Sequence, residues 1–170
     1  MASSTIRYGR GVSKEVGFDL LNLGLGKKKI CLMTDAKVLK LASMQTVLDS
    51  LTRAGLSYDV YSQVAVEPTD RSLKAAIEYC QNKSFDAFVA VGGGSVIDTA
   101  KAANLYMCYP QHEFLDFVNA PIGKGLPVND FNIASLSVDL FFTDTYTDCC
   151  IDTGRPQAAD CHSHHCRNRE

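Results

Sequence analysis

The sequence predicts an α/β protein built on a doubly wound parallel sheet. Short apolar runs, typical of buried strands, alternate with longer segments whose apolar residues recur at helical spacing. Three consecutive glycines follow one of these strands, at the place where such sheets bind ligands. The alternation extends over residues 1–128, which we interpret as one domain. Residues 129–170 lose it, and we expect them to form an irregular tail outside that domain.

The first part of the alternation predicts two strands and two helices. The stretch STIRYG is a candidate edge strand, and a helix is expected over residues 13–23. KKKICLMTD, residues 27–35, is a short and mostly apolar run that predicts a buried strand. Apolar residues then recur at helical spacing over residues 38–51, and Gly55 is placed to end this helix.

The second part adds two strands and two helices in the same order. YDVYSQV, residues 58–64, and FDAFVAV, residues 85–91, predict strands. Between them VEPTD breaks the chain, and Thr69 or Asp70 is placed to cap the helix that follows. A further helix is expected over residues 95–106, directly after the glycines. Strands separated by helices run parallel, so their carboxyl ends should meet at one edge of the sheet.

Composition argues against several classes of partner. A net charge of −2 over 170 residues gives no electrostatic reason to expect a nucleic-acid partner. No apolar run reaches the roughly 18 residues that cross a bilayer, so no membrane partner is expected. The N-terminal residues contain neither the apolar core of a secretory signal nor a convincing transit peptide. The seven cysteines are therefore expected to be reduced.

Gly92, Gly93 and Gly94 stand between a predicted strand and a predicted helix. The first turn of a helix presents unpaired N–H groups and a partial positive charge, which suit a phosphate. Without Cβ atoms in the way, phosphate oxygens can reach the backbone. Ser95 can cap the helix or donate its hydroxyl to the phosphate. The alternative is that the three glycines form only a tight strand-to-helix turn.

Two acidic residues complete the candidate site. Asp35 follows the strand predicted at residues 27–35, where its carboxylate can accept hydrogen bonds from an adenosine ribose or simply cap the strand end. Asp98 lies in the helix after the glycines, and with Lys101 it is also compatible with an ordinary helix-surface pair. The residues therefore favour a dinucleotide site and leave these alternatives open.

The stretch GGGSVIDTAK resembles the GGGSxxDxxK element of the iron-containing (group III) alcohol dehydrogenases. The similarity covers nearly all of residues 6–128 and includes KKKICLMTD, VEPTD, FDAFVAVGGGSVIDTAKAANLY and FLDFVNAPIGKGLPV. It implies a Rossmann-like NAD-binding domain followed by a C-terminal helical domain, and residues 129–170 do not resemble the latter. By position, the resemblance implies pyrophosphate binding by the glycines and Ser95, ribose binding by Asp35, and a place near the nicotinamide for Asp98.

The stretch FLDFVNAPIGKGLPV is most similar to that of an animal mitochondrial member of the family. That resemblance implies small hydroxyacid and oxoacid substrates. 4-Hydroxybutyrate would be oxidised to succinate semialdehyde, and bound NAD would carry the hydride to 2-oxoglutarate to give D-2-hydroxyglutarate. A general NAD-dependent alcohol dehydrogenase is an alternative. The resemblance also implies a mitochondrial location, although the lack of a transit peptide is compatible with the cytoplasm.

The resemblance implies a divalent metal, iron or zinc, that polarises the substrate oxygen. Its family ligands, one aspartate and three histidines of the helical domain, have no counterpart in this sequence. We therefore assign no catalytic residue and no metal ligand to this chain. The other functional class is a catalytically inactive nucleotide-binding or interaction fragment.

The tail has its own interpretation. Its stretch CHSHHC places all candidate zinc ligands within six residues, which argues against a compact structural zinc site. Read one base further along from Pro156, one allowed coding of the tail gives LKPLIATPTTVGTGS, which resembles the PTTxGTGSE phosphate loop of the family. We interpret residues 129 to about 155 as inserted sequence, followed by a shift of the reading frame and an early stop.

Overall fold

The computed structural model describes residues 9–128, 137–140 and 151–154, and most of the candidate strand STIRYG lies outside them. Its five-stranded sheet has the order β2-β1-β3-β4-β5. The strands are β1 (Lys29–Met33), β2 (Ser57–Tyr61), β3 (Ala87–Val91), β4 (Ser137–Leu140) and β5 (Ile151–Gly154). The first four run parallel and β5 runs antiparallel to β4.

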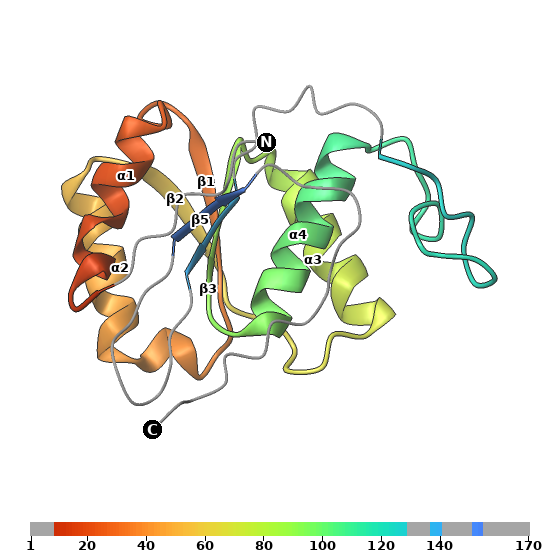
Figure 1. The fold of residues 1–170 in the computed structure, drawn as a ribbon, viewed down its shortest axis with the longest axis horizontal. Helices are drawn as coiled ribbons and strands as arrows, with labels where there is room; N and C mark the ends of the chain where they lie inside the picture. Colours follow the sequence, from red (N-terminus) through yellow and green to blue (C-terminus); the bar gives the residue numbers. More distant parts are fainter. Residues whose placement is uncertain (1–8, 129–136, 141–150, 155–170) are drawn as a thin grey trace.

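Helices cover both faces of the sheet, as the alternation predicts (Figure 1). The helices are η1 (Val12–Glu15), α1 (Val16–Asn22), η2 (Val38–Lys40), α2 (Ala42–Arg53), α3 (Asp70–Lys83) and α4 (Gly94–Cys108). α1 and α2 pack on one face, and α3 and α4 on the other. This arrangement confirms the doubly wound α/β fold, because β2 and β3 lie on opposite sides of β1 and their connecting helices take different faces.

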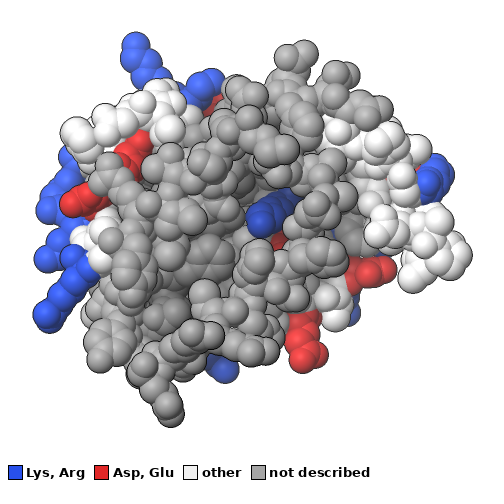
Figure 2. All heavy atoms as spheres, viewed as in Figure 1, with Lys and Arg blue, Asp and Glu red and all other residues white. Residues whose placement is uncertain are grey.

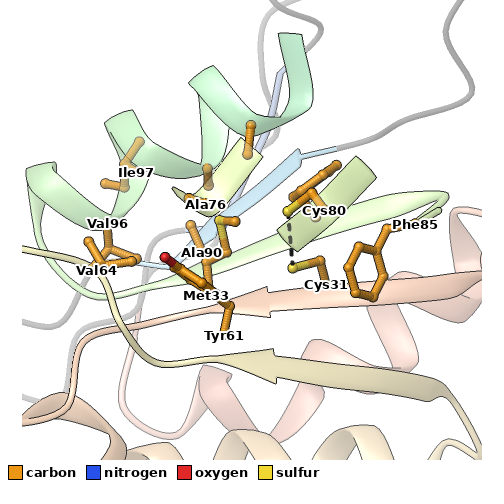
Figure 3. Packing of buried hydrophobic residues seen from close by; sticks show 13 residues of the cluster. Cys31, Met33, Tyr61, Val64, Ala76, Cys80, Phe85, Ala90, Val96 and Ile97 are labelled. Carbon is orange, nitrogen blue, oxygen red and sulfur yellow. Dashed lines mark hydrogen bonds between the residues drawn. The ribbon is translucent and has the colours of Figure 1, made fainter. Parts of the chain in front are cut away.

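Alternate residues of β1 and β3 divide the core in two. Ile30 and Leu32 face the helices α1 and α2, whereas Cys31 and Met33 face α3 and α4. Figure 3 shows the second cluster, in which the Sγ atoms of Cys31 and Cys80 lie 4.0 Å apart. Contact with Cys80 and burial raise the pKa of the Cys31 thiol, which is therefore neutral, and both cysteines are free.

Two helix boundaries follow from local chemistry. The prediction that Thr69 or Asp70 caps α3 resolves to Thr69, whose hydroxyl accepts from the N–H of Ser72 at 3.3 Å in a reciprocal capping box. The single helix expected over residues 38–51 is instead two, η2 and α2. Leu41 interrupts them with an extended backbone, ψ 147°.

The tail differs from the irregular segment that the sequence predicts. β4 and β5 both fall within residues 129–170, and β4 pairs with β3 in parallel. An edge strand presents unpaired backbone N–H and C=O groups, and another segment of chain can pair with them. The expectation of an irregular tail is therefore wrong for residues 137–140 and 151–154. The rest of residues 129–170, CHSHHC included, lies outside the described residues.

Residues 109–128 project beyond the end of α4, away from the sheet (Figure 1). Asp116, which is only 6% exposed, holds this segment together. Its carboxylate lies 2.7 Å from Nζ of Lys124 and 3.0 Å from Nδ1 of His112, and its backbone carbonyl accepts from the N–H of Leu126 at 2.8 Å. Asp116 thus joins both ends of the segment.

We expect this segment to loosen only in strong acid. Contacts with Lys124 and then His112 lower the pKa of Asp116 to about 2 from an ordinary 3.8. Because the pKa is depressed in the folded state, the stabilising contribution is complete above about pH 5 and is lost as pH falls through about 2. Amide protection of residues 112–126, corrected for intrinsic exchange rates, should persist at pH 4 and fall near pH 2 by hydrogen–deuterium exchange. In Asp116→Asn it should already be reduced at pH 7, and equal protection in the variant would contradict this role.

Figure 2 shows several Lys and Arg side chains along the edge formed by α1 and α2, with Asp and Glu beside them. Within the described ranges, no helix is both long and apolar enough to cross a membrane.

Candidate functional site

The carboxyl ends of β1, β2 and β3 meet at one edge of the sheet, as expected for parallel strands. Thr34, the residue after β1, connects all three: its N–H donates to the carbonyl of Tyr61 at 2.9 Å and its hydroxyl donates to the carbonyl of Val91 at 2.8 Å. Thr34 is completely buried. The sequence places Asp35 directly after it, and the glycines directly after Val91. Ligands of such sheets bind at this edge, and we call the site expected between Asp35 and residues 92–95 the crevice.

Asp35 caps a helix and keeps one oxygen free. Its Oδ1 accepts hydrogen bonds from the N–H groups of Lys37 at 2.7 Å and Val38 at 2.9 Å, which fixes the start of η2. Its Oδ2 has no hydrogen-bond partner in the part of the chain that the structure describes. The cap and the ribose contact proposed from sequence therefore use different oxygens and are compatible.

The three glycines are not equivalent. Gly92 is buried, and a Cβ on it would lie 2.6 Å from Cγ2 of Val96, so glycine is needed there for α4 to pack against the end of β3. Gly93 and Gly94 are exposed, and a Cβ on either would meet no protein atom within 4 Å. Gly93 also has an ordinary backbone, φ −87° and ψ −171°. Neither conformation nor packing within the described residues requires glycine at these two positions.

Two backbone N–H groups in the first turn of α4 are available as hydrogen-bond donors. The N–H groups of Val96 and Ile97 donate to the carbonyl of Gly93, at 3.0 and 3.2 Å. No acceptor for the N–H groups of Gly94 and Ser95 is found among the described residues. These two donors lie in the stretch where residues 93 and 94 lack Cβ atoms, and the helix dipole adds partial positive charge there.

Ser95 makes a side-chain contact that the sequence did not suggest. Its hydroxyl does not cap α4 and instead donates to the carbonyl of Val66, in the loop between β2 and α3. A hydroxyl carries one hydrogen, so in this arrangement Ser95 has only its backbone N–H to offer a phosphate. The side chain ties the loop between β2 and α3 to the turn that contains the glycines.

Asp98 is the last of the residues that the sequence predicts for the site. Asp98 is exposed, four residues after Gly94 and so on the same side of α4.

Among the described residues, no three His, Cys, Asp or Glu side chains cluster as a metal site requires. A hollow lined by Lys14, Thr46, Asp49, Thr52 and Arg53 lies on α2 and η1, and none of its residues belongs to the crevice.

Comparisons with known proteins match most of the chain to one protein family. The family described as "Iron-containing alcohol dehydrogenase" matches residues 3–137. Over 128 residues the chain is 60% identical to "Hydroxyacid-oxoacid transhydrogenase, mitochondrial" of Rattus norvegicus, a match that covers 75% of this chain and 27% of the relative. The Homo sapiens protein of that name is 57% identical over 129 residues, with 76% and 27% covered. The chain thus spans about a quarter of the length of these relatives.

Solved structures support the fold. NADH-dependent butanol dehydrogenase A from Thermotoga maritima superposes with a TM-score of 0.69 at 23% identity, covering 84% of this chain and 34% of that one. An iron-containing alcohol dehydrogenase from the same organism gives 0.66 at 23% identity, with 84% and 37% covered. At this identity the likeness concerns the fold alone.

Proposed function

Because the chain belongs to the iron-containing alcohol dehydrogenase family, a family of oxidoreductases, we propose that its crevice binds NAD. The observation that carries this proposal is the pair of exposed glycines. Gly93 and Gly94 lack Cβ atoms next to two N–H groups that have no acceptor among the described residues, although nothing in the described fold requires glycine at either position. The close approach of a ligand oxygen accounts for both.

Each crevice residue has a separate task in this proposal. The N–H groups of Gly94 and Ser95 donate to pyrophosphate oxygens, and the free Oδ2 of Asp35 accepts from the hydroxyls of the adenosine ribose. Asp98 lies toward the nicotinamide. When bound, NAD supplies the acceptor for a hydride from the substrate. The chain binds and orients it, and Thr34 and Ser95 hold the loops around it.

For the whole protein we propose transfer of hydride from a small hydroxyacid to an oxoacid, with 4-hydroxybutyrate and 2-oxoglutarate as the pair. Support comes from the names of the relatives and the identity of up to 60%. A divalent metal belongs to this proposal, but the described residues do not form a site for it, and we derive no step through it. A mitochondrial location is proposed on the same similarity.

A nucleotide-binding chain without catalytic activity is the second candidate. Its described residues contain no cluster of side chains that could hold a metal. An assay with 4-hydroxybutyrate, 2-oxoglutarate and NAD that measures formation of succinate semialdehyde and 2-hydroxyglutarate separates the two, because bound NAD passes its hydride on and no net NADH accumulates. NAD binding without either product supports the second candidate, whereas formation of both products supports the first.

We expect Asp35→Asn to weaken NAD binding about tenfold without disturbing η2. Asparagine keeps a carbonyl oxygen for the two N–H groups that Asp35 caps, but it replaces the free carboxylate oxygen by a neutral amide, and a charge-assisted hydrogen bond to the ribose is lost. Calorimetric titration of the 170-residue chain with NAD measures this, with thermal unfolding as the check on folding. A folded wild-type chain that does not bind NAD would refute the proposed site. Equal affinity of the variant would remove Asp35 from it.

A further inference from the structure

We propose that Thr34 is a positioning residue that sets the separation between Asp35 and the glycines. This inference rests on the NAD site proposed above. Thr34 does not reach the crevice itself, because its side chain is completely buried. It acts through its neighbours, since Asp35 follows it in sequence and its hydroxyl donates to the carbonyl of Val91, the residue before Gly92.

A residue that fixes their separation is needed at this point because the two segments that follow β1 and β3 diverge here. The pairing of β1 with β3 ends at Met33 and Ala90. After β1 the chain turns into η2, whose Val38 and Leu39 pack with the α1 and α2 side of the core. After β3 it turns into α4, which packs on the opposite face. The β1–β3 ladder has no residue pair beyond this one, so the ladder itself does not fix the distance between the segments that follow the two strands.

The Thr34 hydroxyl continues the ladder by one bond. It donates to the last carbonyl of β3 at 2.8 Å, while the Thr34 N–H continues the β1–β2 ladder with a bond of 2.9 Å to Tyr61. Side chains with a hydroxyl are the smallest that can provide such a bond, and burial keeps water from competing for it. One residue therefore fixes all three strand ends around the crevice.

The dinucleotide must meet both sides of the crevice at once. In the proposed function its ribose contacts Asp35 and its pyrophosphate contacts the backbone after Gly93. If the two sides shift apart, a dinucleotide held by its pyrophosphate at the glycines no longer reaches Asp35, even though each group is still present. Loss of the Thr34 bond should therefore act through the contact with Asp35.

Calorimetric titration of the 170-residue chain with NAD tests this with four variants. Thr34→Val keeps the shape and removes the donor, and it should weaken binding about fivefold to tenfold. Thr34→Ser restores the hydroxyl and should bind within about twofold of the wild type. In the Asp35→Asn background, Thr34→Val should change affinity by less than about twofold, because the contact that it positions is already impaired.

Ser50→Ala is the matched control for loss of a buried hydroxyl. The Ser50 hydroxyl donates to the carbonyl of Lys14 at 2.8 Å and accepts from the N–H of Gly17 at 3.0 Å, away from the crevice. The variant should lose stability and keep its affinity for NAD. If Thr34→Val does not fold, Thr34→Cys, whose thiol is a weak donor of similar size, replaces it with the same expectations.

The outcomes separate this inference from the proposed function. No NAD binding by a folded wild-type chain overturns both. Wild-type binding with unchanged affinity in Thr34→Val overturns the role of Thr34 and leaves the site. If Thr34→Val lowers the affinity equally with and without Asp35→Asn, its effect is purely structural, and this result also overturns the role of Thr34. If Thr34→Val lowers the affinity for NAD only when Asp35 is present, and Thr34→Ser restores the affinity, the role of Thr34 is supported.

Discussion

Gly93→Asp is expected to abolish NAD binding while leaving the fold intact. Gly93 precedes α4 with an extended backbone that any residue can adopt, and a Cβ there meets no described residue within 4 Å apart from its chain neighbours. Aspartate is among the preferred residues at this capping position, so stability should change by only a few tenths of a kcal/mol. The introduced carboxylate would accept from the N–H of Ser95 and occupy the place of the phosphate with a negative charge. We expect affinity to fall about 100-fold or more, the loss of one or two charge-assisted hydrogen bonds.

Calorimetry and thermal unfolding of the same preparation check both halves of this expectation. The melting temperature of Gly93→Asp should lie within about 2 °C of that of the wild type. Binding within threefold of the wild type would contradict a phosphate site at this turn. A large loss of stability would instead mean that the position is structural, against the open space seen around it.

Gly92→Ala is expected to have the opposite profile, with its main effect on stability. The new Cβ would lie 2.6 Å from Cγ2 and 3.0 Å from Cβ of Val96, and Gly92 is buried with φ +158°. Val96 belongs to the core between the sheet and α4, so it cannot move without loosening that packing. We expect the free energy of unfolding to fall by about 1–3 kcal/mol, the usual cost of overpacking a core.

Urea unfolding measures this change, and Gly94→Ala is the matched control. Gly94 is the first residue of α4, and a Cβ on it meets open space. Because alanine favours helices over glycine, this control should be neutral or slightly more stable. Equal stabilities of Gly92→Ala and Gly94→Ala would contradict the steric role of Gly92.

The functional site illustrates how far sequence reasoning reaches. The positions of Asp35 and the glycines at one edge follow from the parallel order of strands, which the alternation predicts. The identity of the family follows from GGGSVIDTAK and the stretches around it, and the comparison over residues 3–137 confirms it. The partner of Ser95 was missed, because the loop that contains Val66 carries no signal of where it folds back. Thr34 was missed for the same reason, although its place at the end of a buried strand could have suggested it.

By itself the sequence determined the fold class, the family and the residues at the strand ends, because these depend on periodicity and on short motifs read locally. Only the tertiary structure decided which glycine serves packing and which two leave space, where the hydroxyls of Ser95 and Thr34 donate, and that strands form in the tail. The Ser95 contact joins residues 29 apart in sequence and the Thr34 contact joins residues 57 apart. Such pairs leave no period in the sequence, since they depend on how the helices place the loops around the sheet.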